Sequence, residues 1–329
     1  MTAAGGGVGL KIGAGALAAL LWAWLAAGIE GRARAPGAPH LWAVDRDAGE
    51  VLALDQDAWV VRRWGVPWPL EVAVATDGAV WVLASRGPGP LAARRLLRFD
   101  DSGRQIYGRE FDHAEALHAI PGGSIGLLIG TGAARELIDL DASGEETRRS
   151  PAAHAQNCWA RGSDRLLGGG GRLWRASTGT ELDLGGGTHV AVATRSTGWW
   201  VVVRRPEGLH CLHFDESLAL EGSVSLHRLA PDRALRGEAL RAGADAFWVV
   251  PRAGAPWHVY PSGAAHSRSA WQPIAVTAAI EAPAGGLWLA SPGALVRLDA
   301  RGSPGPGQGG FAHLQDISPA AGPPWRLAE

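Results

Sequence analysis

Short apolar segments recur along the chain at a regular spacing, and this periodicity restricts the fold more than any other feature. The segments are LWAVD from Leu41, VWVLA from Val80, IGLLIG from Ile125, RLLGG from Arg165, WWVVV from Trp199, FWVVP from Phe247 and LWLAS from Leu287. Between Trp42 and Trp288 their mean spacing is about 41 residues. Each segment is short and rich in β-branched or aromatic side chains, which favours a strand over a helix.

Three further strands accompany each apolar segment. A second strand usually follows and ends in aspartate, as in VLALD at Asp55, LLRFD at Asp100 and LVRLD at Asp299. A turn and a more polar strand come next, and a strand of small residues such as LEVAVA precedes the following segment. Small side chains suit strands crowded around a common axis, and about 40 residues for four strands is typical of a β-propeller. We therefore expect an all-β, seven-bladed β-propeller of four-stranded antiparallel blades over residues 40–321.

The first and last units are complementary. The unit at 41–64 lacks an innermost strand, and the C-terminal segment LQDISPAAG resembles the missing strand. The sequence therefore predicts that LQDISPAAG pairs beside LWAVD and closes the propeller without an unpaired seam. The unit at 165–187 is short and rich in glycine, so six or eight blades are alternatives.

The N-terminal region contains an uncharged apolar run at 12–29, IGAGALAALLWAWLAAGI. As a helix this run is about 27 Å long, close to the ~30 Å hydrocarbon core of a bilayer. A cleaved signal peptide and a buried core helix are alternatives, but the run favours a single-pass transmembrane anchor with Trp22 and Trp24 at the membrane interface. Residues 1–11 are then a tail, 30–39 a linker and 322–329 a second tail. We expect the propeller on the periplasmic or extracytoplasmic side, because such segments ordinarily direct export.

Composition excludes some classes of function. The chain has 31 basic and 32 acidic residues and no basic stripe, so a nucleic-acid partner is not expected. Cys158 and Cys211 form no metal motif and fall in different units, which predicts two separate buried thiols. The sequence contains no phosphate-loop, CxxCH or EF-hand motif.

The run PLEVAVATDGAVWV, followed by LLRFDDSG, resembles blades of the NHL, streptogramin-lyase-like and gluconolactonase-like propeller superfamily. WD40 repeats are less similar, because no unit has both a Gly-His start and a Trp-Asp end. For a lactonase the resemblance implies a divalent metal held by Glu, Asn and Asp, of which Glu71 and Asn157 are candidate members. For a lyase it implies a catalytic His near a Glu, and His113 with Glu115 matches that pattern.

Propellers usually bind ligands where loops enter the innermost strands, at one mouth of the central channel. The polar residues predicted there are Glu71, His113, Glu115, His154, Asn157, His189, Glu238, Gln272, His313 and Asp316. The four histidines come from different units and would bind a metal if they converged. The alternative is that they are ordinary strand-start residues, since a single register error disperses them.

The 16 tryptophans divide into two groups. Those in the apolar segments are predicted to fill the space between blades: Trp42, Trp81, Trp200, Trp248 and Trp288. The others are interface candidates, since exposed indoles anchor interfaces: Trp59, Trp64, Trp68, Trp257 and Trp271. The leading hypothesis is a membrane-anchored scaffold without a cofactor, which binds another protein or is an accessory subunit of a membrane complex. The alternatives are a metal-dependent lactonase- or lyase-type hydrolase at the channel mouth and a carbohydrate or cell-wall binding module.

Overall fold

A computed structural model describes residues 39–89, 92–120, 123–161, 164–195, 197–226, 237–241, 247–251, 256–259, 265–267, 276–282, 286–299, 301 and 303–319. Across these ranges the regular elements are β-strands, apart from one 3-10 turn at Gly132–Ala134. No helix in the described ranges is long and apolar enough to cross a membrane. The predicted anchor at 12–29, its Trp22 and Trp24, and also Trp271 and Gln272, lie outside the described residues.

The strands form seven antiparallel sheets, numbered here in chain order, with strands given from the innermost outward. Sheet 1 contains β27 (Leu314–Pro319), β1 (Leu41–Asp45), β2 (Glu50–Leu54) and β3 (Val60–Gly65). Sheet 2 contains β4 (Pro69–Val74), β5 (Val80–Ser85), β6 (Arg94–Phe99) and β7 (Gln105–Phe111). Sheet 3 contains β8 (Ala114–Ile120), β9 (Ser124–Ile129), β10 (Glu136–Leu140) and β11 (Glu146–Pro151).

The remaining sheets follow the same order, with one exception in strand number. Sheet 4 contains three strands, β12 (Asn157–Arg161), β13 (Asp164–Gly169) and β14 (Arg172–Arg175). Sheet 5 contains β15 (Thr188–Arg195), β16 (Gly198–Arg205), β17 (Gly208–Phe214) and β18 (Leu220–Ser225). Sheet 6 contains β19 (Gly237–Arg241), β20 (Phe247–Pro251), β21 (Trp257–Val259) and β22 (Ala265–Ser267). Sheet 7 contains β23 (Ala278–Ala282), β24 (Gly286–Ser291), β25 (Ala294–Leu298) and β26 (Pro304–Gly309).

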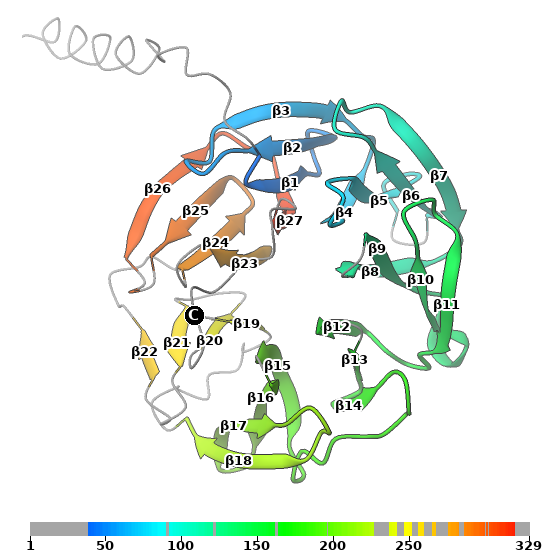
Figure 1. The fold of residues 1–329 in the computed structure, drawn as a ribbon. Coiled ribbons are helices and arrows are strands. Elements are labelled where there is room, and N and C mark those ends of the chain that lie inside the picture. Colours follow the sequence, from blue (N-terminus) through cyan, green and yellow to red (C-terminus); the bar gives the residue numbers. More distant parts are fainter. Residues whose placement is uncertain are drawn as a thin grey trace, which may run out of the picture. The chain divides into compact units, whose positions relative to one another are not determined.

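The innermost strands surround a common axis (Figure 1). Each contacts the next in the order β27, β4, β8, β12, β15, β19 and β23, and β23 contacts β27 again. The described residues therefore form an all-β propeller, with six four-stranded blades and the three-stranded sheet 4 between two of them.

Sheet 4 corrects the expectation of seven four-stranded blades. After β14 the chain makes one isolated bridge, between Trp174 and Glu181, in place of a fourth strand. The segment ASTGTELDLGGG includes Gly179, Gly185 and Gly186, all with positive φ. Glycine in this conformation forms turns and loses more backbone freedom in a strand than other residues do. A regular outer strand is therefore disfavoured in this unit.

The two ends of the propeller meet in sheet 1, as the sequence predicts. Strand β27 pairs antiparallel with β1, and Ala43 lies opposite Ile317. The carboxylate of Asp45, only 3% exposed, accepts hydrogen bonds of 2.8 Å from the backbone N–H groups of Ala312 and His313. Since a buried carboxylate without partners is strongly unfavourable, these bonds fix the start of β27 against the end of β1.

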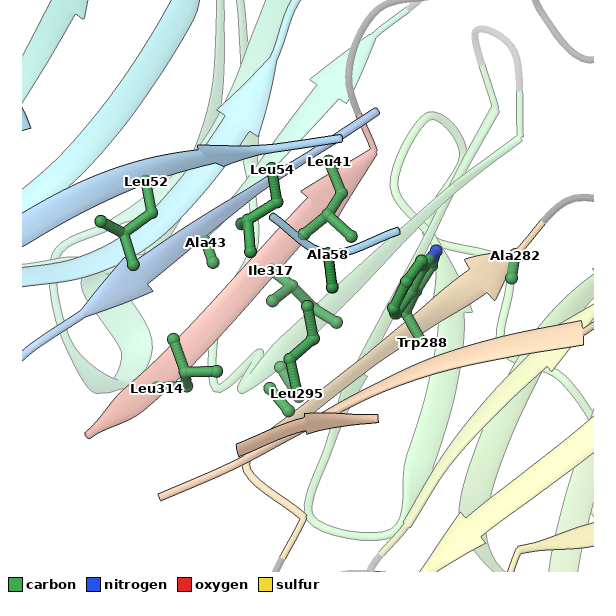
Figure 2. Packing of buried hydrophobic residues seen from close by; sticks show 12 residues of the cluster. Leu41, Ala43, Leu52, Leu54, Ala58, Ala282, Trp288, Leu295, Leu314 and Ile317 are labelled. Carbon is green, nitrogen blue, oxygen red and sulfur yellow. The ribbon is translucent and has the colours of Figure 1, made fainter. Parts of the chain in front are cut away.

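Apolar side chains fill the space between neighbouring sheets. Figure 2 shows Leu41, Leu54 and Ile317 of sheet 1 packed towards Trp288 and Leu295 of sheet 7. The tryptophans of the apolar segments are at most 4% exposed: Trp42, Trp81, Trp200, Trp248 and Trp288. Their predicted role between blades is confirmed. Cys158 and Cys211 are separate free thiols, as predicted, but only Cys211 is fully buried and Cys158 is half-buried.

The repeated aspartate stabilises the turn before the outermost strand in sheets 1, 2, 3, 5 and 7. In sheet 2, Asp100 Oδ1 accepts hydrogen bonds of 3.0 Å from the backbone N–H groups of Ser102 and Arg104. The same pattern of bonds to residues two and four positions later occurs at Asp55, Asp141 and Asp299. Aspartate is favoured here because its short side chain reaches backbone donors within a turn.

The glycine of the same turn makes room for a ring from the preceding sheet. Gly103 in sheet 2 packs against the indole of Trp64 in sheet 1, and an added Cβ would lie 2.2 Å from Trp64 Nε1. Gly144 in sheet 3 packs in the same way against Tyr107 of sheet 2. The repeated Asp and Gly therefore have two functions, turn formation and contact between sheets.

Candidate functional site

Two of the predicted channel-mouth carboxylates connect successive innermost strands. Asp316 on β27 accepts a 2.8 Å hydrogen bond from the backbone N–H of Val72 on β4. Glu71 on β4 accepts bonds of 3.3 and 2.6 Å from the N–H groups of Ala116 and Leu117 on β8. The strand register shifts beside the acceptor Glu71 in β4 and around the donors Ala116 and Leu117 in β8. Burial raises the pKa of Glu71, and the Leu117 N–H opposes that shift.

A compact ionic cluster lies beside Glu71 at the start of β8. His113 Nε2 is 2.8 Å from Glu115 Oε1 and 3.2 Å from Arg135 Nη2. Arg135 Nη1 is 3.2 Å from Glu115 Oε2, and the same guanidinium donates to the carbonyl oxygens of Gly130 and Ala155. The Arg135 side chain is 10% exposed, whereas that of Glu115 is 40% exposed. Arg135 is thus a buried positioning group, and Glu115 and His113 border the solvent.

Of the other predicted residues, His154 lies just before β12 of sheet 4, Asn157 is the first residue of β12, and Glu238 lies on sheet 6. The backbone N–H of His154 donates to Gly132 O at 2.8 Å, and both His154 and Asn157 are exposed. Glu238 lies on β19, opposite Val250 in the register.

The remaining two histidines have separate neighbours. His189 on β15 meets the ring of Trp159 edge to face, with 5.9 Å between centroids, and burial lowers the pKa of His189. His313 Nδ1, just before β27, is 3.7 Å from Asp47 Oδ2.

The donor set expected for a lactonase-type metal does not fit these positions. Both carboxylate oxygens of Glu71 accept backbone N–H groups, which leaves this side chain fixed against β8. Within the part of the chain that the structure describes, no three His, Cys, Asp or Glu side chains gather closely enough to hold a metal ion. The mouth described here is therefore a site of hydrogen bonds and ion pairs.

A second polar cluster, which sequence reasoning missed, lies between sheets 3 and 4. His118 Nε2 on β8 is 3.7 Å from Cys158 Sγ on β12. Burial lowers the pKa of His118 to about 4 and raises that of Cys158 to about 12, so both groups are neutral near pH 7. Arg165, 2% exposed, lies near both, and burial raises the pKa of Asp139 beside it.

The sequence does carry a signal for this cluster. Gly126 occupies the position in β9 that corresponds to Trp81 in β5, and an added Cβ there would lie 2.2 Å from His118 Nε2. The imidazole of His118 thus lies where five of the other six sheets carry an indole. Gly126, in place of the repeated tryptophan, leaves space for a side chain on the neighbouring strand β8, and this space identifies His118 as the residue that fills it.

Three residues near the mouth have positive φ without being glycine. They are Trp68 (φ 53), Ala116 (φ 55) and His154 (φ 61), at the starts of the innermost strands of sheets 2, 3 and 4. Trp68 lies between Pro67 and Pro69, and a residue before proline normally adopts extended backbone. Such strain is rare for bulky residues and is concentrated at functional sites.

The predicted interface tryptophans differ in environment. Trp59 is 60% and Trp68 is 40% exposed. Trp64 stacks on Phe99, with 5.5 Å between centroids, and Trp257 packs against the core of sheets 5 and 6.

An open groove of about 540 Å³ lies between sheets 1 and 2. Its lining residues are Arg62, Arg63 and Trp64 from β3, with Asp101 and Ser102 from the turn between β6 and β7.

Comparisons with known proteins identify a fold. No family model and no curated protein matches the sequence. A candidate 6-phosphogluconolactonase from Bacteroides uniformis superposes with a TM-score of 0.61 at 12% identity, covering 85% of this chain and 98% of that one. A Lactobacillus plantarum protein gives 0.56 at 9% identity, with coverage of 85% and 98%. The WD40 domain of Pan2 from Neurospora crassa gives 0.56 at 13%, with coverage of 84% and 89%. The chain is therefore an all-β propeller, similar in fold to both lactonase-like and WD40-like propellers.

Proposed function

We propose that this protein is a membrane-anchored, extracytoplasmic propeller that binds another protein, as a scaffold or as an accessory subunit of a membrane complex. The observation that carries the proposal is the pair of exposed indoles, Trp59 immediately before β3 and Trp68 immediately before β4. Exposed tryptophan is enriched among the residues that dominate binding energy. The backbone N–H of Trp59 donates to Asp55 Oδ1 at 3.0 Å, so the backbone of Trp59 is fixed before any partner binds.

The bonding of the channel mouth supports a scaffold over an enzyme. Asp316 and Glu71 accept backbone N–H groups, and Arg135 donates to backbone carbonyls. These charged groups stabilise contacts between sheets, and an enzyme needs reactive groups that are free to contact a substrate.

Purification in mild detergent from native membranes tests the scaffold proposal. Light scattering is expected to show a stoichiometric hetero-complex that dissociates when Trp59 and Trp68 are both changed to Ser. Leu220→Ser on sheet 5 is the matched control, because Leu220 is 52% exposed but distant in the chain from β3. Recovery of a lone monomer from native membranes contradicts the proposal.

The anchor at 12–29 has its own test. The full-length chain is expected to stay in the membrane pellet after alkaline carbonate extraction, and a chain lacking residues 1–29 is expected to be released. Release of the full-length chain contradicts the anchor. Protease access to the propeller in intact cells stripped of their outer layers tests its extracytoplasmic location.

A second candidate function, a lactonase- or lyase-type hydrolase, is favoured by the 2.8 Å contact between His113 Nε2 and Glu115 Oε1. A carboxylate that orients an imidazole is a recurring arrangement in general acid–base catalysis. The sequence-based hypothesis assigns this enzyme a divalent metal. Metal content measured by plasma mass spectrometry, together with the activity of His113→Ala on a panel of lactones, tests it. Absence of a stoichiometric metal and unchanged turnover in His113→Ala contradict this function.

A further inference from the structure

We infer that the groove between sheets 1 and 2 binds an extended, acidic segment of the partner protein, an inference that rests on the proposed function. The groove has a volume of about 540 Å³ and lies along β3, the outermost strand of sheet 1. The outer edge of a terminal strand presents backbone N–H and C=O groups that an added strand can pair with. An open groove beside such an edge suits a passing chain segment better than a small molecule, which proteins usually enclose.

The charge of the groove selects the partner's side chains. Arg62 donates to the backbone carbonyl of Asp101, a neutral group, and within the described residues no carboxylate lies within ion-pair distance of its guanidinium. Arg63 differs, because it pairs with Glu50 at 3.2 Å. Arg149 on β11 of sheet 3 is also neutralised, by two glutamates. Arg62 therefore offers its charge to a carboxylate supplied from outside, and arginine binds carboxylates with two parallel hydrogen bonds.

A second charge fixes the direction of the bound segment. The exposed carboxylate of Asp101 lines the same groove and accepts hydrogen bonds only. The bound segment then carries an Asp or Glu side chain opposite Arg62 and a donor, such as Lys or a backbone N–H, opposite Asp101. Where that donor is Lys, the two opposite charges are recognised in this order and disfavour the reversed segment.

The indole that lines the groove is fixed before binding. Trp64 contacts Trp42 in a tilted arrangement, at 4.6 Å between ring centroids, and stacks on Phe99 at 5.5 Å. Gly103 packs against the same indole. Because this ring is already ordered, a segment that packs against it loses less free energy to ordering the groove.

Photo-crosslinking of the full-length protein in its own cells tests the inference. Benzoylphenylalanine is placed separately at Trp59, three residues before Arg62 in the chain, at Trp68 and at Leu220. Each crosslinked peptide is sequenced by mass spectrometry, synthesised and titrated against the purified full-length protein. From Trp59 we expect a peptide that contains Asp or Glu. Its affinity is expected to fall about tenfold or more with Arg62→Glu and to change less than about twofold with Arg301→Glu, an exposed control arginine on the turn after β25. Affinity for Arg62→Glu is expected to return when the peptide's acidic residue is changed to Arg.

The outcomes separate this inference from the proposed function. Crosslinks from Trp68 or Leu220 with none from Trp59 overturn the groove and leave the scaffold in place. A Trp59 peptide whose affinity is unaffected by Arg62→Glu also overturns the groove. No crosslinked partner from any of the three positions overturns the proposed function together with this inference.

Discussion

At the scale of single residues, close contacts decide which side chains the fold accepts. Gly103 and Gly78 illustrate this, because they have nearly the same backbone, with φ of +84° and +85°. An added Cβ at Gly103 meets the Trp64 indole, whereas one at Gly78 meets no heavy atom within 4 Å. The two positions therefore separate the conformational preference of glycine from the space that the ring requires.

We predict that Gly103→Ala lowers the free energy of unfolding by about 1–3 kcal/mol more than Gly78→Ala, because only the former forces the Trp64 ring to move. Both variants share the cost of positive φ for alanine. Urea denaturation followed by tryptophan fluorescence measures the difference. Equal losses in the two variants contradict close packing of the indole on Gly103.

The buried His118 makes stability depend on pH. Its pKa is about 4 in the folded chain, below the ordinary value near 6.5, because burial disfavours the imidazolium. Between these two pH values the unfolded chain takes up a proton that the folded chain does not, so stability falls as pH is lowered through the window. The loss amounts to up to about 3 kcal/mol.

The variant His118→Gln is expected to lose this part of the pH dependence, whereas exposed His154→Gln keeps it. Denaturation midpoints between pH 7 and 4 measure the slopes. A slope in His118→Gln that equals the wild-type slope contradicts the assignment.

At the scale of elements, the turn that begins with the repeated aspartate is the unit that recurs. The Ser102 hydroxyl, followed by the Arg104 N–H, holds the pKa of Asp100 below its ordinary value. The pKa values of Asp141 and Asp215 are lowered in the same way by Ser143 and Ser217. A lowered carboxylate pKa stabilises the fold above the unfolded pKa of about 3.9, and the contribution is lost as pH falls through the folded value.

Asp100→Ala is expected to lower the melting temperature by about 2–4 °C at pH 7, because two backbone N–H groups lose their acceptor. The neighbouring Asp101→Ala is the control, since the turn bonds are formed by Asp100. The deficit of Asp100→Ala is expected to shrink as the pH approaches 3. A melting temperature equal to that of Asp101→Ala contradicts the role of the repeated aspartate.

At the scale of the whole molecule, much of the fold was predictable and the site was less so. The apolar segments and the pairing of LQDISPAAG beside LWAVD follow from strand periodicity, which depends on local pattern and on the need to close the ring. The three-stranded sheet 4 was mispredicted, because turn-forming glycines outweighed the repeat. The hydrogen bond between Glu71 and Leu117 and the burial of His118 depend on neighbouring sheets, and periodicity within one unit cannot give such distances.

The central claim is that the two ends of the propeller form one blade, with β27 as its innermost strand. Amide hydrogen exchange read by mass spectrometry tests it most directly, because paired amides exchange only when the sheet opens. Peptides covering 41–45 and 314–319 are expected to exchange slowly and at the same opening free energy, since Ala43 lies opposite Ile317 in one ladder. Exchange of 314–319 within seconds, while 41–45 stays protected, contradicts the closure.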